Sequence, residues 1–253
     1  EMEYLVLGPA SMGIFTMLGA LINIEDDLKN IKEISGSSAG AILGVCLALE
    51  IPLYDVLDKF LKVDLEKHTK YNLKSFMKNY GLIDLDPIRE VLKDVFGCDP
   101  TFSDLKRKLH ISTYCLNRGR TEYFSSDSHP DMKVIDAVCM SISIPILASS
   151  VKLNDMIYMD GGIKERVPIT PFEGEAPHKI LCLKLKSQDI FFEKIATFSK
   201  FVETFMSSLL NIRADINLDK IGKVVEVDTE DYDLFSFKMS FDDKLRLFLL
   251  AFK

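Results

Sequence analysis

Basic residues are scarce in this 253-residue sequence: 31 Lys and Arg stand against 38 Asp and Glu, which gives a formal net charge of −7 at pH 7. A chain with this balance has no broad positive surface for the phosphate backbone of nucleic acids, so we expect no nucleic-acid partner. The same balance opposes strong attraction to anionic lipids. Any transient membrane contact should therefore depend on apolar side chains rather than on charge.

Paired cysteine motifs are also absent. The sequence has no C-x-x-C, and its five scattered cysteines cannot all be paired within one chain: Cys46, Cys98, Cys115, Cys139 and Cys182. Such usage is typical of proteins that stay in a reducing compartment. We therefore expect an intracellular, cytoplasmic protein whose association with membranes, where it occurs, is peripheral.

The sequence lacks a clear transmembrane segment as well. Residues 4–24 carry no charge and are numerous enough to cross a bilayer. However, Gly8, Pro9, Ser11 and Gly13 interrupt this run, and two glutamates precede it where a signal peptide would carry Lys or Arg. We therefore expect a strand, a turn and a helix here instead of a membrane span.

No repeat of fixed period, low-complexity tract or linker rich in Gly, Ser or Pro divides the chain, so we expect one domain over residues 1–253. Strand and helix patterns alternate along it, which predicts an α/β sheet covered by helices. The expected strands are residues 4–7, 30–34, 110–116, 120–124, 156–159, 179–183 and 224–227. The expected helices are residues 11–24, 38–49, 86–96, 132–141 and 241–252.

A serine stands at one predicted junction between a strand and a helix. Residues 35–40 contain the pattern G-x-S-x-G, with Gly36 and Gly40 on either side of Ser38. A nucleophilic serine on such a sharp turn needs neighbours without side chains, because the turn crowds itself. The N-terminus of the following helix also supplies unpaired N–H groups, which favour developing negative charge. The alternative is that both glycines only allow the helix to pack closely on the strand.

The first predicted strand ends in a similar turn of small residues, Gly8-Pro9-Ala10-Ser11-Met12-Gly13. If the two strands are parallel neighbours, both turns lie at one edge of the sheet, where α/β proteins place their sites. This loop can then aim backbone amides at an oxyanion beside the serine. The alternatives are an ordinary tight turn or a phosphate-binding loop, although neither G-x-G-x-x-G nor a Walker-type Gly-Lys-Ser is present.

A serine nucleophile needs a base, and the sequence offers two candidates. Asp160 ends a predicted strand, and Gly161 and Gly162 after it permit a sharp turn that leaves its carboxylate at the strand end. The same Asp-Gly pair is also common in plain hairpin turns. His178 follows Ser38 and Asp160 in the chain order of the α/β-hydrolases, so a Ser-His-Asp esterase is the alternative. Against that alternative, only one predicted strand precedes the strand of the serine.

Taken in order, these motifs resemble those of the patatin-like phospholipases, a family of lipid acyl hydrolases. The resemblance covers residues 4–170 and includes the small-residue loop, the G-x-S-x-G turn and the Asp-Gly-Gly of residues 160–162. Residues 136–145, which end in Ile-Pro, and the Arg-Val-Pro of residues 166–168 also fit the family. Residues 171–253 are less recognisable.

The resemblance implies a three-layer α/β/α sandwich with a central, mostly parallel sheet. It also implies that Ser38 is the nucleophile and Asp160 its base, in a dyad that uses no histidine, metal or cofactor. The expected substrate is a phospholipid or another fatty-acyl ester. Gly36 and Gly40 then form the nucleophile elbow, and the oxyanion site comprises Gly8, Pro9, Ala10, Ser11, Gly13 and Ala39.

One departure from the family pattern concerns this oxyanion site. The family's first loop usually reads Gly-Gly-Gly-x-Arg-Gly, whereas this chain has Pro9 and Met12 there. Pro9 has no N–H to donate, and the loss of one donor can cost about 3 kcal/mol of transition-state stabilisation. Amides of Ala10, Ser11 and Ala39, or the Ser11 hydroxyl, are the available substitutes. The departure also motivates a further alternative, a catalytically weak relative that binds lipid or regulates.

An apolar stripe runs through residues 190–212 at helical spacing. We interpret it as the face of a helix that packs on the core, and the alternative is an acyl-chain wall or an interfacial docking surface. The stripe comprises Phe191, Ile195, Phe198, Val202, Phe205, Leu209 and Ile212, with Phe201 beside it.

Overall fold

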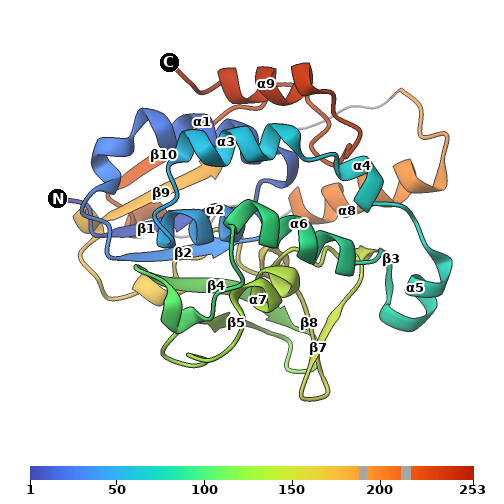
Figure 1. Cartoon of the computed structure of the whole chain (residues 1–253), viewed down its shortest axis with the longest axis horizontal. Coiled ribbons are helices and arrows are strands. Elements are labelled where there is room, and N and C mark those ends of the chain that lie inside the picture. Colours follow the sequence, from blue (N-terminus) through green and yellow to red (C-terminus); the bar gives the residue numbers. More distant parts are fainter. Residues whose placement is uncertain (188–192, 212–217) are drawn as a thin grey trace.

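The computed structural model describes residues 1–187, 193–211 and 218–253 (Figure 1). Its strands are β1 (Tyr4–Leu7), β2 (Glu33–Ser37), β3 (Gly81–Ile83), β4 (Lys108–Cys115), β5 (Arg120–Phe124), β6 (Ile146–Ala148), β7 (Val151–Leu153), β8 (Met156–Asp160), β9 (Ile180–Leu185) and β10 (Lys223–Val227). Its helices are α1 (Ile14–Asn23), α2 (Ala39–Ala48), α3 (Leu53–Lys62), α4 (Leu65–His68), α5 (Leu73–Asn79), α6 (Asp86–Phe96), α7 (Val134–Ser141), α8 (Phe198–Asn211) and α9 (Phe241–Leu249).

Most strands belong to one mixed sheet in the order β10-β9-β1-β2-β4-β8-β7, with β5 also paired to β4. The strands from β10 to β4 run parallel, whereas β5 and β8 are antiparallel to β4, and β7 is antiparallel to β8. Because β1 and β2 are parallel neighbours, the turns that follow them lie at the same edge of the sheet. A separate short sheet pairs β3 with β6.

Helices cover one face of this sheet in two tiers. α1, α2 and α7 contact the strands, and α3, α6 and α9 pack on these helices; Figure 1 shows α1, α3 and α9 together on one side. The main core lies between the helices and the sheet. The other face of β1 and β9 packs against Phe172 and neighbouring turn residues. The predicted α/β fold with a central, mostly parallel sheet flanked by helices is confirmed.

Several elements form where their end signals predict them. α6 spans residues 86–96 as expected, with Pro87 in its first turn and Gly97 in the left-handed region (φ 70°) at its C-terminus. α9 begins with a capping box in which Ser240 and Asp243 bond each other's backbone N–H groups. β4 and β5 form the expected antiparallel pair. Local chemistry therefore fixes these boundaries.

Other boundaries differ from the prediction. The second strand covers Glu33–Ser37 instead of residues 30–34, because the small polar residues Ser35, Gly36 and Ser37 are buried between two parallel neighbours. The helix expected over residues 11–24 begins with a 3₁₀ turn over Ser11–Gly13, and α1 follows. The uncharged run thus folds as strand, loop and helix. None of the helices among the described residues is both long and apolar enough to cross a membrane.

The core-facing interpretation of the stripe in residues 190–212 is wrong for most of α8. Val202 is buried, and it packs together with Met206 against Ile83, Ile144 and Leu147. Phe191 and Ile212 lie outside the described residues. The remaining side chains of the stripe are exposed, and so is Phe201 beside it: Ile195, Phe198, Phe205 and Leu209.

Candidate active site

The backbone of Ser38 is strained. Ser38 lies between β2 and α2, and its backbone has φ 55° and ψ −121°. The residue is buried, with only 6% of its surface exposed. A residue with a Cβ rarely adopts a positive φ, and holding it there costs about 1–3 kcal/mol. Such strain persists only where the surrounding structure fixes the turn. The G-x-S-x-G pattern therefore forms a sharp turn between strand and helix, as the sequence predicts for a nucleophile elbow.

Ser141 holds this turn in place. The Ser38 N–H donates to Ser141 Oγ at 2.8 Å, and Ser141 Oγ donates in turn to the carbonyl oxygen of Ser112 at 2.6 Å. The end of α7 thus connects the elbow to β4. The sequence prediction gave Ser141 no role, because a serine in a run of small residues has no pattern that marks its partner.

Gly36 and Gly40 are required by close backbone approach. A Cβ on Gly40 would lie 2.4 Å from the carbonyl oxygen of Leu7, and one on Gly36 would lie 2.6 Å from the carbonyl oxygen of Gly40. Neither contact can be relieved by a side-chain rotation, because backbone atoms are involved. The two glycines therefore let the end of β1, and the loop that follows it, lie directly against the elbow.

Asp160 is a buried carboxylate at the end of β8. It is 3% exposed and pairs with Thr113 of β4. Its N–H donates to the carbonyl oxygen of Ser143 at 3.0 Å, and its Oδ1 accepts the Gly162 N–H at 2.8 Å. These bonds fix both the backbone and the carboxylate.

Burial raises the pKa of Asp160 to about 6. The hydrogen bond from Gly162, hydrogen bonding with the Ser38 hydroxyl and the positive charge of Arg166 all lower this pKa, but burial outweighs them. The Ser38 hydroxyl is therefore close enough to Asp160 to favour its ionised form. A base whose pKa lies near the working pH is suited to proton transfer.

The small-residue loop lies against the Asp-Gly-Gly turn. A Cβ on Gly162 would lie 3.0 Å from Asp160 Oδ1 and 3.4 Å from Pro9 Cγ. One on Gly161 would lie 2.4 Å from the carbonyl oxygen of Ser112. Three segments far apart in the sequence, the loop after β1, the elbow and the Asp-Gly-Gly turn, therefore meet at one edge of the sheet.

This arrangement of motifs has a counterpart among known families. The family model for patatin-like phospholipases matches residues 5–173, about two thirds of the sequence. The chain belongs to the patatin-like phospholipase family.

Curated relatives of this patatin-like chain include viral and bacterial proteins. It is 29% identical over 188 residues to an uncharacterized protein of Acanthamoeba polyphaga mimivirus (69% of this chain and 63% of that protein). It is 23% identical over 177 residues to a probable lipid hydrolase of Invertebrate iridescent virus 6 (64% and 60%). It is 27% identical over 162 residues to a cGAMP-activated phospholipase of Pseudomonas aeruginosa (60% and 47%). The chain spans less than two thirds of the length of each of these relatives.

The fold of the patatin-like chain is similar to two solved structures. VipD from Legionella pneumophila matches with a TM-score of 0.63 at 15% identity, over 100% of this chain and 65% of VipD. The type III effector ExoU of Pseudomonas aeruginosa matches with a TM-score of 0.54 at 17% identity, over 99% of this chain and 51% of ExoU. At these identities the likeness shows the fold alone.

Several hydrogen-bond donors in the first loop of the patatin-like chain are bonded within the protein and so are not available to an oxyanion. The Gly8 N–H donates to the carbonyl oxygen of Leu183 at 3.0 Å, and the Gly13 N–H donates to that of Ala10 at 2.8 Å. The Ser11 hydroxyl, one of the predicted substitutes for the donor missing at Pro9, donates to the carbonyl oxygen of Leu234 at 2.7 Å.

The remaining candidates for an oxyanion site are backbone amides. Among the residues that the structure describes, nothing accepts a hydrogen bond from the N–H of Ala10, Ser11 or Ala39. Ala39 is the first residue of α2, so its N–H also lies at the positive end of the helix dipole. Ser11 and Ala39 line the same cavity as Ser38, so the first loop and the elbow both border this cavity.

This cavity is apolar and has a volume of about 180 Å³. For comparison, an apolar protein cavity of about 150 Å³ holds a benzene molecule. Side chains of α1, α3, α6 and the segment after α7 form most of its walls, among them Phe15, Phe60, Leu92 and Ile144. Its size and lining suit a segment of hydrocarbon chain next to the serine.

The structure separates His178 from the site. His178 is exposed in the turn that precedes β9, whereas Ser38 follows β2. Because β9, β1 and β2 are parallel, the start of β9 and the end of β2 lie at opposite edges of the sheet. The Ser-His-Asp alternative is therefore wrong for this fold. Elsewhere, His110 bonds Glu33 through Nε2 at 2.9 Å, and His129 packs on Phe124.

Proposed function

We propose that this protein is a metal-independent lipid acyl hydrolase of the phospholipase A or lysophospholipase type, with Ser38 as nucleophile and Asp160 as base. The observation that carries the proposal is the burial of Asp160 beside the hydroxyl of a strained elbow serine. The apolar cavity that reaches Ser38 supports a fatty-acyl ester as the substrate. The names of two relatives, a probable lipid hydrolase and a cGAMP-activated phospholipase, agree with this class of reaction.

In the first half of the reaction, Asp160 accepts the proton of Ser38 Oγ while this oxygen attacks the ester carbonyl carbon. The carbonyl oxygen becomes an oxyanion, which the amides of Ala10, Ser11 and Ala39 are placed to stabilise. When the carbon–oxygen bond to the alcohol breaks, the leaving oxygen takes the proton from Asp160. The products are the free alcohol, here a lysolipid or glycerol derivative, and an acyl-serine.

In the second half, water replaces the alcohol. Asp160 accepts a proton from the water, whose oxygen attacks the acyl-serine carbonyl, and the same amides stabilise the second oxyanion. Collapse of this intermediate releases the fatty acid and returns the proton to Ser38 Oγ. At pH 7 a carboxyl group with a pKa of about 6 is mostly ionised, so Asp160 is available as the base in both steps.

A fluorophosphonate probe for activated serines tests the nucleophile. We expect labelling of the wild type and of Ser37→Ala, the matched control in the same turn, and no labelling of Ser38→Ala. Release of fatty acid from phospholipid should follow the same pattern, and Asp160→Asn should lose turnover while it stays folded. Equal labelling of the wild type and Ser38→Ala would remove Ser38 from the role of nucleophile.

A second candidate function, lipid binding or regulation with weak catalysis, is favoured by Pro9. Pro9 supplies no N–H, and the neighbouring Gly8 N–H is bonded to Leu183. If one oxyanion donor is missing, Pro9→Gly should raise kcat about a hundredfold, provided that the restored N–H faces the oxyanion. Lipid binding without any release of fatty acid that depends on Ser38 would instead support the second candidate.

A further inference from the structure

Two helices expose large apolar side chains. On α5, Leu73 is 74% exposed and Met77 is 78% exposed, and on α8, Phe198 is 66% exposed. On both helices these residues recur every three or four positions, so they form a stripe along the outer side. The exposed members are Leu73, Phe76, Met77 and Tyr80 on or next to α5, and Phe198, Phe201, Phe205 and Leu209 on α8. We call these eight residues the docking face.

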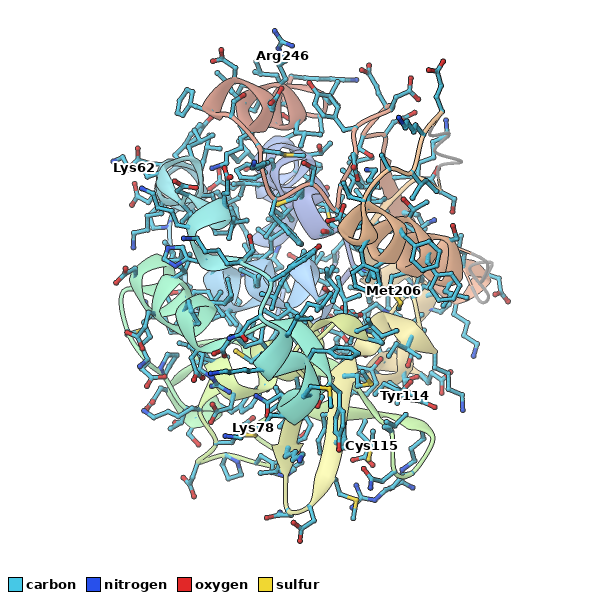
Figure 2. All side chains as sticks on the ribbon, turned by 90° about the vertical axis from the view of Figure 1, so that its right-hand side faces the viewer. Lys62, Lys78, Tyr114, Cys115, Met206 and Arg246 are labelled. Carbon is cyan, nitrogen blue, oxygen red and sulfur yellow. The ribbon has the colours of Figure 1, made fainter. Side chains whose placement is uncertain are left out.

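The two helices that carry the docking face are neighbours. The hydroxyl of Tyr71, just before α5, donates to Glu203 Oε1 of α8 at 2.9 Å. Figure 2 looks onto this side of the molecule and shows both helices toward the viewer, with Lys78 labelled on α5 and Met206 on α8. Phe201 and Phe205 stack with ring centroids 5.9 Å apart. The two helices therefore carry their exposed apolar side chains on the same side of the molecule.

Positive charge gathers beside α5, although the chain as a whole is negative. Residues 67–83 contain four lysines and no Asp or Glu, in a sequence whose net charge is −7. Lys67 pairs with Asp64, whereas Lys70, Lys74 and Lys78 form no ion pair within the described part of the chain. The average charge, from which we expected only apolar membrane contact, thus does not describe this side of the protein.

Lysines also line two hollows beside α5. One, of about 490 Å³, contains Lys74, Lys78 and Lys152, and the other, of about 630 Å³, contains Lys70 and again Lys74. Asp84 lies in both hollows, and Asp86 and Arg89 also line the first, so basic side chains still outnumber acidic ones in each hollow. The second hollow also contains Leu73 of the docking face, so ammonium groups lie next to an exposed apolar side chain there.

We infer that the docking face binds the surface of a bilayer that contains anionic lipids. Apolar and aromatic side chains flanked by lysines are typical of helices that lie in the membrane interface, where the side chains enter the acyl region and the ammonium groups meet lipid phosphates. A membrane satisfies both features of this face at once. The positive charge of residues 67–83 favours an anionic membrane surface over a neutral one.

The position of α8 connects this docking to the proposed hydrolysis, on which the inference rests. Through Val202 and Met206, α8 packs on Ile83, Ile144 and Leu147. These three residues also line the cavity that reaches Ser38. Docking therefore brings the membrane to the helix that packs on the outer side of the cavity wall.

Binding to vesicles tests the inference, with Ser38→Ala as the background so that lipid is not consumed. We expect binding to vesicles of phosphatidylcholine mixed with phosphatidylserine, and weaker binding to phosphatidylcholine alone. Lys74→Gln with Lys78→Gln should weaken binding to the anionic vesicles about 25-fold, because each lysine near an anionic surface contributes about a factor of five. The matched control, Lys29→Gln with Lys32→Gln on another side of the molecule, should bind like the background protein.

The apolar half of the face has its own variants. Leu73→Ser with Met77→Ser should weaken binding to both kinds of vesicle by at least about tenfold, since the apolar surface of two side chains is no longer transferred from water into the membrane. Phe198→Ser should act in the same direction. Phe241→Ser, at a phenylalanine of α9 that is 56% exposed and outside the face, is its control.

A soluble short-chain ester separates this inference from the proposed function. In a background with intact Ser38, the docking-face variants should hydrolyse the soluble ester like the wild type and lose activity only on vesicles.

Wild-type protein that binds no vesicles, or variants that bind as well as the wild type, would overturn the docking face. Self-association that only the docking-face variants abolish, without vesicle binding, would assign the face to a second copy of the chain. Normal vesicle binding without Ser38-dependent ester hydrolysis would leave the docking face in place and refute the proposed function.

Discussion

Replacing the buried base Asp160 by asparagine should stabilise the protein while it removes activity. The carboxylate is ionised in a place from which water is excluded, and asparagine has nearly the same shape without the charge. The amide oxygen of asparagine can still accept the Gly162 N–H bond that Oδ1 accepts now. The main change is therefore that a charge no longer has to be buried.

The raised pKa of Asp160 gives the size of the effect. Folding raises this pKa from 3.8 to about 6, and a rise of about 2 units corresponds to about 3 kcal/mol. Because the folded protein binds this proton more tightly than the unfolded chain, ionisation destabilises the fold as the pH rises from about 4 to 6. The gain from Asp160→Asn should be close to zero at pH 3, about 1 kcal/mol at pH 4.5 and about 3 kcal/mol at pH 8.

Denaturant unfolding of both proteins at several pH values measures this difference. In thermal unfolding at pH 8, the gain should raise Tm by about 6–12 °C for a chain of this size. Asp131→Asn, which changes an exposed carboxyl group, is the control and should alter stability little. If Asp160→Asn is no more stable than wild type at pH 8, or gains equally at pH 4.5 and pH 8, the burial of a charged Asp160 is not what raises its pKa.

Three further predictions concern the same site. The kcat/KM for a soluble ester should rise with pH and level off above an apparent pKa of about 6, because Asp160 must be ionised to accept a proton; a profile without an inflection there argues for another base. Ser38→Gly should have a free energy of unfolding about 1–3 kcal/mol higher than that of Ser38→Ala in denaturant unfolding, because only glycine adopts φ 55° without strain. Gly40→Ala should destabilise the protein by about 1–3 kcal/mol despite the better helix propensity of alanine, since its Cβ would lie 2.4 Å from the carbonyl oxygen of Leu7; unchanged stability would show that the end of β1 can move away.

The sequence was informative about the site wherever a backbone requirement selects the residue type. Glycines flank Ser38 because other backbone atoms occupy the space of a Cβ, and this requirement is visible as a motif. Ser141 and Ser143 were not predicted as positioning residues. Ser141 acts through its Oγ on the elbow and Ser143 through its carbonyl oxygen on Asp160, and such partners are set by tertiary structure.

The fold was predictable where local signals mark the ends of an element. α6 has a first-turn proline and a C-terminal glycine, so its bounds follow from the sequence. β2 was misplaced because its buried residues are small and polar, whereas hydrophobic periodicity depends on large apolar ones. The stripe of α8 was assigned to the core because periodicity identifies an apolar face without identifying what covers it.

The bonds that hold the first loop have a consequence for the evolution of the C-terminal third. Gly8 bonds the carbonyl oxygen of Leu183, and Ser11 bonds that of Leu234, both beyond residue 173 where the family match ends. Main-chain carbonyl oxygens are available from any amino acid. This third can therefore diverge until no motif remains and still support the loop, whereas a truncation at residue 173 would leave the loop without its anchors.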